Sequence, residues 1–382
     1  MKKTLIVAAL AGVSGMLATA AHAQSSVTLY GLIDASVAYT NNTGSGAKYA
    51  LNSGSINGSR WGLRGAEDLG GGLKAIFVLE NGFSIANGTM LQQSREFGRQ
   101  AFVGLSSNQF GTVTLGRQYE SVVDYLAPLA LTGGGYGGTL AAHPYDNDNL
   151  NSSIRVNNTI KYTSVNYNGL KFGGEYGFSN AAGGFSNNRA YSGGVSYQYA
   201  GFNFAGAYTQ LNNTSSNTTS GAIGSAPITA ARTRIWGAGL NYAFGPAVVG
   251  FVFTQSKYDN ASSDSYNVTQ AIALPVGSYI RFNNFEVNGR YSLTPAWNVS
   301  ASYTYTQGRE SGFAAGSASP KFHTGTLMTS YSLSKRTDVY AEAVYQQFTG
   351  TNFLGGAVIN TTGSASSSNR QVAAAVGVRH RF

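Results

Sequence analysis

A strict alternation of apolar and polar residues is the feature that most constrains how this chain can fold. The stretch WNVSASYTYT places five apolar residues on one side of an extended chain, namely Trp297, Val299, Ala301, Tyr303 and Tyr305. The residues between them are Asn, Ser and Thr. A helix would instead set apolar residues three and four positions apart. The stretch therefore predicts a β-strand with one apolar face and one small polar face.

Segments of this kind recur along the whole chain and predict sixteen strands. They lie near 27–39, 58–67, 72–81, 97–107, 110–118, 157–164, 170–178, 190–199, 202–210, 232–243, 246–257, 279–291, 296–306, 322–331, 335–348 and 370–382. The connections alternate between tight turns such as NYNG and LTP and long loops rich in Ser, Thr, Asn and Gly. Strands of about ten residues joined in this way are typical of a transmembrane β-barrel.

We therefore predict an all-β fold, a 16-stranded antiparallel transmembrane β-barrel with short periplasmic turns and long outer loops. The final strand, VAAAVGVRHRF, can pair with the first, VTLYGLIDASVAY, so that no strand edge is exposed to lipid. A very large secreted β-sandwich is the soluble alternative. It does not explain the alternating loop lengths or the polar second face of most strands.

The front of the chain has the pattern of an export signal. Lys2 and Lys3 precede an apolar stretch that ends in Ala21-His22-Ala23, the small residues of a cleavage site. We predict a cleaved signal peptide at 1–23 and a single barrel at 24–382, whose net charge falls from +9 to +7 with the loss of the two lysines. This diffuse basicity, in an exported chain, argues against a nucleic-acid partner. The absence of Cys excludes a disulfide framework and thiolate chemistry.

Several motifs resemble one family. SRWGLRGAEDLGGGLKAIFVLENGF, FGRQAFVGLSSNQFGTVTLGRQY, RVNNTIKYTS and the terminal VGVRHRF closely resemble the trimeric general porins of Gram-negative outer membranes, best their β-proteobacterial branch. The resemblance implies a homotrimer, surrounded by outer-membrane lipid and lipopolysaccharide, that lets ions and small hydrophilic solutes diffuse passively. It also implies that Phe382 is the assembly signal read by the outer-membrane assembly machinery.

The longest connection, between Tyr119 and Val156, resembles the third loop that folds into such barrels and narrows the pore. It carries acidic residues that we expect at the constriction, namely Glu120, Asp124, Asp146 and Asp148. The resemblance assigns the opposite, basic wall to Arg60, Arg99, Arg117 and Arg155, with the carboxylate of Glu80 beside it. We therefore expect a mild anion preference, because four arginines face one wall carboxylate.

Strand parity supports part of this assignment. Arg60 and Arg64 share the face away from Trp61, and Lys74 and Glu80 share the face away from the apolar residues of the next strand, so all four are predicted to face the lumen. Strict alternation would turn Arg117 outward. Its inward placement therefore requires a bulge or kink near Gly116.

The other motifs give little indication of a binding or catalytic site. Gly133, Gly135 and Gly138 fit a dinucleotide-binding pattern, but no strand-to-helix unit surrounds them. The histidines of the mature chain, His143, His323 and His380, are predicted to be isolated surface residues, so we expect no metal, no cofactor and no histidine-based catalysis. The competing functions are a barrel enzyme, an adhesive barrel and a substrate-specific channel, of which a sugar channel would need a run of aromatic residues along the lumen.

Overall fold

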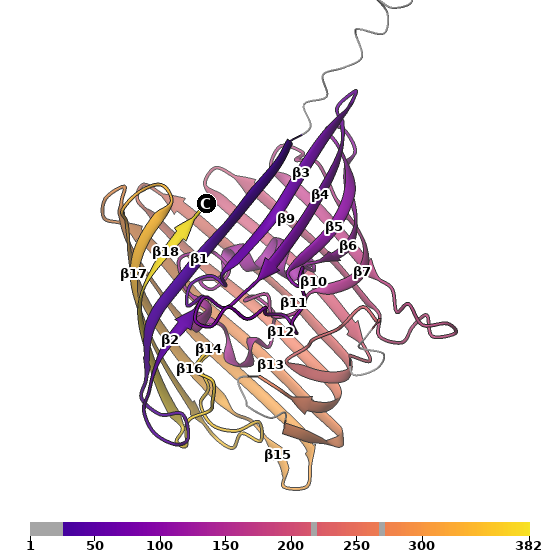
Figure 1. Cartoon of the computed structure of the whole chain (residues 1–382). Helices are drawn as coiled ribbons and strands as arrows, with labels where there is room; N and C mark the ends of the chain where they lie inside the picture. The colour runs from indigo at the N-terminus through magenta and orange to yellow at the C-terminus, as the bar shows by residue number, and fades with distance from the viewer. Residues whose placement is uncertain (1–25, 215–219, 267–271) are drawn as a thin grey trace, which may run out of the picture.

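The computed structural model describes residues 26–214, 220–266 and 272–382, which form a closed antiparallel β-barrel (Figure 1). The predicted signal peptide, residues 1–23, lies outside the described residues. Among the described residues, no helix is long and apolar enough to cross a membrane.

In the described residues the barrel sheet contains eighteen strands in chain order. They are β1 Ser26–Thr40, β2 Lys48–Ser53, β3 Arg60–Gly70, β4 Leu73–Gly82, β5 Gln100–Ser107, β6 Gly111–Gln118, β7 Val156–Thr163, β8 Leu170–Gly177, β9 Ala190–Tyr199, β10 Phe202–Asn212, β11 Ile228–Phe244, β12 Ala247–Asp264, β13 Ile272–Ser292, β14 Trp297–Phe313, β15 Gly316–Ala318, β16 Lys321–Ser332, β17 Thr337–Thr349 and β18 Arg370–Arg381. Strand β2 pairs with β1 beyond the end of β3, and β15 is a short strand in an outer hairpin. The other sixteen are the predicted strands, so the predicted fold class is confirmed.

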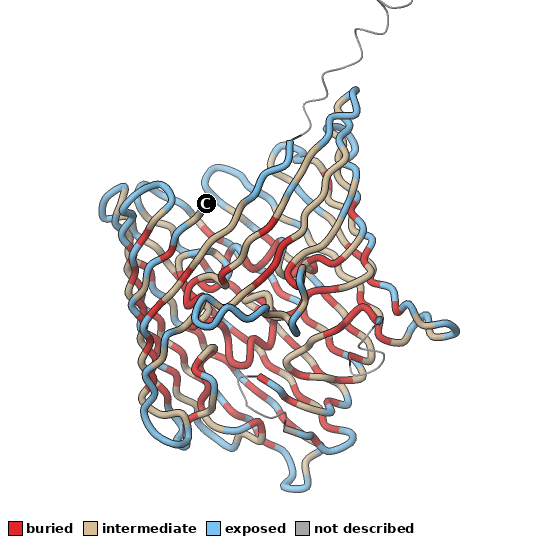
Figure 2. The backbone as a smooth tube through the Cα atoms, in the orientation of Figure 1, coloured by how far each residue is buried: buried red, intermediate tan, exposed pale blue. Residues whose placement is uncertain are grey.

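The alternation of the sequence corresponds to the two faces of the wall. Outward side chains such as Val103 and Leu115 are 56% and 52% exposed in the isolated barrel, as expected for residues that contact lipid. Inward residues such as Thr304 and Asn284 are buried against the barrel interior. Figure 2 shows buried residues along the wall and in the loop inside the barrel, and exposed residues at both rims.

Several strands are longer than predicted at their outer ends. The strand expected at 279–291 runs as β13 from Ile272 to Ser292, and β12 and β14 likewise continue beyond 257 and 306. Hydrogen bonding between neighbouring strands continues past the apolar belt, where the outward face no longer has to be apolar. The alternation pattern therefore stops before the strands do.

The first and last strands close the barrel, as predicted. Strand β1 pairs with β18 from Leu32 opposite Arg381 to Thr40 opposite Ala373. The backbones of Gly31 and Phe382 exchange two hydrogen bonds of 3.0 and 3.1 Å. A Cβ on Gly31 would lie 2.5 Å from the Phe382 ring, so only glycine allows the ring to lie against the backbone there.

Between β2 and β3 the chain leaves the wall and folds into the barrel. This inward segment, residues 54–59, is held by the buried carboxylate of Asp34, which accepts a hydrogen bond of 2.8 Å from the backbone N–H of Asn57. The backbone N–H of Thr139 in turn donates to the carbonyl of Ser55 at 2.7 Å. The inward segment thus connects the wall near the closing strands with the long loop in the lumen.

An apolar cluster fills part of the lumen, which the predicted polar lining did not anticipate. The ring of Tyr145, from the long loop, lies 5.9 Å from the ring of Phe282 on β13 and 6.1 Å from that of Phe322 on β16. Leu354 and Val358, from the last outer loop, complete the cluster. This lumen cluster thus connects loop 3 with β13, β16 and the last outer loop.

Candidate pore constriction

The connection between β6 and β7, residues 119–155, lies inside the barrel and is called loop 3 below (Figure 1). It contains four short helical turns, η1 Val122–Leu126, η2 Ala127–Leu129, η3 Thr139–Ala141 and η4 Pro144–Asp146. Val122 and Leu126 are fully buried and pack against the wall with Ile235 and Val252. The inward folding of the third loop is therefore present in the structure.

Polar groups of the wall hold the backbone of loop 3. The N–H of Leu131 donates to the Glu286 carboxylate at 2.7 Å, and the N–H of Gly138 donates to the Glu342 carboxylate at 3.0 Å. The Asn288 amide donates to the carbonyl of Leu129 at 2.9 Å. Because a loop in the lumen has no sheet to bond to, these inward side chains satisfy its backbone groups.

His143 forms the strongest of these attachments. Its Nδ1 lies 2.6 Å from Asp148 and its Nε2 lies 2.9 Å from Glu286, and all three side chains are fully buried. Burial opposes the charge on His143, but the two carboxylates outweigh it and raise the pKa of His143 to about 10. The prediction that His143 is an isolated surface residue is therefore wrong. Its wall partner is 143 positions away in the chain, so no local pattern indicated it.

Three of the predicted arginines meet around one cavity of about 420 Å³, namely Arg60, Arg99 and Arg155. Arg99 Nε donates to Glu80 at 2.7 Å, and both side chains are at most 8% exposed. The lining from loop 3 also includes the neutral residues Thr132, Asn151, Ser152 and Ser153. The charged side chains that line this cavity are thus all arginines.

Tyr119, at the start of loop 3, is a constriction residue that sequence reasoning missed. Its hydroxyl accepts hydrogen bonds from Arg99 Nη2 at 2.8 Å and from Arg155 Nη2 at 3.2 Å. The Arg155 guanidinium also lies 5.1 Å from the centre of the Tyr119 ring. Tyr119 therefore holds the two arginines side by side in spite of their like charge.

Arg117 does not join this cavity. The bulge predicted near Gly116 is present, as a φ of 142° at Gly116 and a register shift between Gly116 and Gln118. It turns Arg117 into a buried position, where Nε donates to the carbonyl of Gly98 at 2.8 Å and Nη1 donates to the side chain of Asn157. Arg117 thus connects the segment before β5 with β7.

The acidic residues of loop 3 do not face the arginines, which differs from the expected arrangement. Asp146 is buried and accepts hydrogen bonds from the N–H groups of Asn151 at 3.0 Å and Ser153 at 3.2 Å. Burial, together with nearby Asp148, raises the pKa of Asp146 to about 7. Asp148 binds His143. These two buried carboxylates are thus satisfied by protein groups, among them the backbone of loop 3 and His143.

The other two loop carboxylates are likewise used to hold loop 3. Asp124 forms an ion pair with Lys161 on β7, and Glu120 accepts a hydrogen bond of 2.6 Å from the N–H of Val122 at the start of η1. Neither lines the arginine cavity. Their positions depend on loop geometry, which has no periodicity that a sequence could show.

Arg64 and Lys74, which were also predicted to face the lumen, do not line the arginine cavity. The guanidinium of Arg64 on β3 lies 5.1 Å from the centre of the Tyr30 ring. The Tyr30 hydroxyl donates to Glu80 at 3.0 Å. Lys74 is an even number of residues from Glu80 on β4 and shares its face, near the turn between β3 and β4. Glu80 is therefore held from two sides, by Arg99 and by Tyr30.

Comparisons with known proteins identify the family of this barrel. A family model described as Gram-negative porin matches residues 6–351. An outer membrane porin protein of Bordetella pertussis is 32% identical over 420 residues, and outer membrane porin protein 32 of Delftia acidovorans is 30% identical over 392, each covering all of both chains. An anion-selective porin from Comamonas acidovorans has the same fold, with a TM-score of 0.71 and 26% identity, over 94% of this chain and 100% of that one. The chain belongs to the Gram-negative porin family and is a multi-pass protein of the outer membrane.

Proposed function

We propose that the barrel is a water-filled channel for passive diffusion of ions and small hydrophilic solutes, with a modest preference for anions. Membership of the porin family indicates a channel rather than an enzyme, and the proposed flow needs no chemical step. The observation that carries the anion preference is the cavity lined by Arg60, Arg99 and Arg155. The nearby carboxylate of Glu80 does not line the cavity and is already paired with Arg99.

The physical basis is the local balance of charge. Arginine stays charged at any working pH, and a charged lining in a narrow water-filled passage discriminates between ions. Charges elsewhere on the barrel count less, because salt at 0.1 M screens them within about 10 Å. The loop carboxylates that could have offset the arginines are bound by groups of loop 3 or, for Asp124, by Lys161 of the wall. The relative from Comamonas acidovorans, described as anion-selective, supports the same sign.

The reversal potential of the wild-type protein in a planar bilayer tests this function. Under a gradient of KCl we expect the reversal potential to shift from zero toward the equilibrium potential of chloride. The shift should be larger at low salt than at high salt, because salt screens the arginine charges. Symmetrical salt, where the potential should be zero, is the control. A potential on the potassium side would contradict the proposal.

We also propose a homotrimer in a membrane of lipid and lipopolysaccharide, built from chains that have lost residues 1–23. Family membership and the apolar outward face of the wall support it. Native mass spectrometry in mild detergent should give three times the mass of a chain that starts at Gln24. A spectrum of monomers only, or of chains that retain residues 1–23, would refute the corresponding part.

We propose, finally, that Phe382 is the signal read by the assembly machinery. Its place at the closing pair with Gly31 supports a role in completing the barrel. Deleting Phe382 should lower the yield in outer-membrane fractions a few-fold, whereas Phe382→Tyr should preserve it. Refolding of both variants in detergent separates recognition from stability. Equal outer-membrane yields for the deletion and the wild type would exclude the proposed signal.

A further inference from the structure

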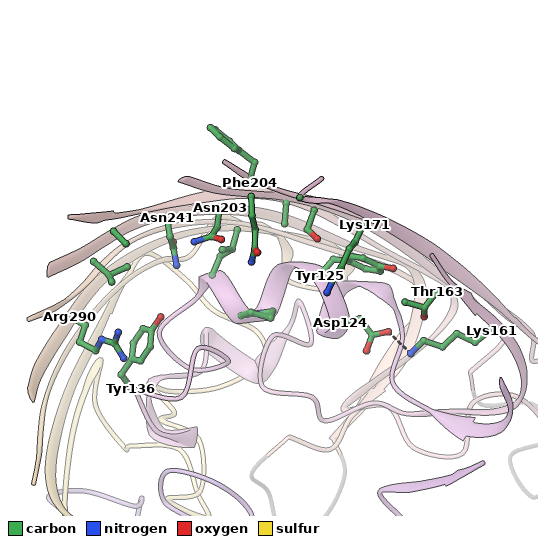
Figure 3. A pocket seen from close by; sticks show the side chains of 18 residues that line it. Asp124, Tyr125, Tyr136, Lys161, Thr163, Lys171, Asn203, Phe204, Asn241 and Arg290 are labelled. Atoms are coloured by element: carbon green, nitrogen blue, oxygen red, sulfur yellow. Dashed lines mark ion pairs between the residues drawn. The ribbon is translucent and has the colours of Figure 1, made fainter. Parts of the chain in front are cut away.

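A second cavity, of about 620 Å³, lies between loop 3 and the inward face of the wall from β7 to β13 (Figure 3). It shares no lining residue with the arginine cavity. Its lining includes Gly169 and Gln198, which are next to short turns of the barrel. The cavity is therefore on the periplasmic side of loop 3. Its volume is within the range of about 300–1,000 Å³ of small-molecule sites.

The charged groups of this loop-3 cavity leave it basic. It contains three cations, Lys161, Lys171 and Arg290, and one carboxylate, Asp124, which is paired with Lys161. In the part of the chain that the structure describes, neither Lys171 nor Arg290 forms an ion pair, and Arg290 Nε is buried without a hydrogen-bond partner. Two cations are thus available to an anion from the lumen.

Arg290 is held in a defined orientation. Its guanidinium lies 4.5 Å from the centre of the Tyr136 ring, and Figure 3 shows the two side chains together at one end of the cavity. Stacking on a ring covers one face of the guanidinium and leaves its edge free to bind a carboxylate in the plane. Lys171 enters the cavity from β8, toward the other end.

The remainder of the lining is apolar on the loop side and mixed on the wall side, where amides alternate with apolar residues such as Ala205 and Val248. Loop 3 contributes Tyr125, Pro128 and Leu129, whereas Asn203 and Gln198 come from the wall. Apolar and aromatic surface with a few placed polar groups suits a ligand with a flat apolar body. A chloride ion has no such body, and a neutral sugar has no charge for the two cations.

We propose that the loop-3 cavity binds small aromatic carboxylates, with Arg290 contacting the carboxylate, Leu129 contacting the ring, and Lys171 adding positive charge from the other end of the cavity. This inference rests on the proposed function, because solute reaches the cavity through the channel. Binding here makes the cavity a stopping place for aromatic anions between the constriction and the periplasm.

Benzoate block of the open channel tests the proposal, with the full-length barrel in planar bilayers and benzoate added on the periplasmic side. Current fluctuations give its dissociation constant. Acetate carries the charge without the ring, and benzyl alcohol carries the ring without the charge. Because the site uses both parts, each should bind about tenfold more weakly than benzoate. Equal block by acetate and benzoate would overturn the proposal.

Variants locate the binding site. Arg290→Gln should raise the benzoate dissociation constant about tenfold, the loss expected for a charge-assisted hydrogen bond. Lys171→Gln is a second variant, at an exposed position where the change has little effect on folding. The matched control is Arg64→Gln, which removes an arginine also stacked on a tyrosine but outside the loop-3 cavity.

The control variant Arg64→Gln distinguishes binding in the loop-3 cavity from a general electrostatic attraction of benzoate to the basic lumen. Arg64→Gln should change the benzoate constant less than about twofold, since the charge is screened over the distance between the two sites. An equal loss in Arg64→Gln and Arg290→Gln, or no loss in either cavity variant, would overturn the site. The proposed anion-preferring channel is tested separately, by the reversal potential in KCl before benzoate is added. A preference for potassium there would contradict the proposed function and not the benzoate site.

Discussion

Replacing Arg60 by Glu should remove most of the anion preference while the channel stays open. The arginine cavity is lined by Arg60, Arg99 and Arg155, and Glu80 lies next to it, paired with Arg99. The variant changes the local balance from three positive charges against one negative charge to two against two. At about 8 Å in a water-like dielectric, screened by 0.1 M salt, each unit charge contributes about 0.25 kcal/mol, with opposite sign for the two ions. A change of two charges therefore shifts the chloride-to-potassium permeability ratio about fivefold. The reversal potential in a KCl gradient measures this shift directly.

Arg232→Glu is the matched control for this change. Arg232, near the outer end of β11, has a side chain that is 47% exposed and paired with Asp259. The charge change is the same but lies far from the constriction, so the reversal potential should move much less. Equal shifts for the two variants, or no shift for Arg60→Glu, would contradict the assignment of the constriction.

His143→Leu should release loop 3 from the wall. The variant leaves the carboxylates of Asp148 and Glu286 buried without their shared cation. Removing one partner from a buried ion pair costs about 3–5 kcal/mol. Because these groups hold loop 3 against β13, we expect frequent closures in single-channel recordings, at lower voltage than in the wild type.

Two variants make this result specific. His323→Leu makes the same change on β16, where the histidine contacts the exposed Tyr303 hydroxyl, and should leave closures unchanged. The triple variant His143→Leu/Asp148→Asn/Glu286→Gln removes the uncompensated charges and should restore a quieter channel. If His143→Leu is as quiet as the wild type, His143 does not hold loop 3.

The same attachment predicts a dependence on pH. The folded-state pKa of His143, about 10, is above its ordinary value of 6.5, so the stabilisation is fully present below about pH 6.5 and is lost as pH rises through about 10. Closures of the wild-type channel should therefore increase near pH 10. The triple variant lacks the histidine, and it measures the contribution of other groups that titrate there.

The barrel could be predicted because one physical requirement repeats in every strand. Each segment must be apolar toward lipid and can be polar toward the lumen, and the period of two records this along the chain. The inward segment, residues 54–59, could not be predicted in this way. The segment is held inside the barrel by the carboxylate of Asp34, which is on another strand. The residue pattern of the segment itself gives no sign of that contact.

The candidate constriction shows the same difference between residues on regular strands and residues on loops. The inward direction of Arg60 and Glu80 followed from strand parity, because both are on regular strands, whereas their place at the constriction followed from the resemblance. Arg99 and Arg155 came only from resemblance, and Tyr119 from neither. The directions of the loop carboxylates failed because a loop has no repeating geometry, and their partners, such as Thr209 for Glu120, are distant in sequence. Sequence patterns therefore located the wall of the pore better than the loop that narrows it.

The lumen cluster has a consequence for the order in which the channel is completed. Tyr145 belongs to the first half of the chain, but the groups around it include Phe322, Leu354 and Val358, close to the end. The cluster can form only after the last hairpins have arrived and the barrel has closed. Until then loop 3 lacks the contacts of Tyr145 in this cluster, whereas Val122 and Leu126 can already pack against β11 and β12. The packing of loop 3 is therefore completed last, although the loop is synthesised early.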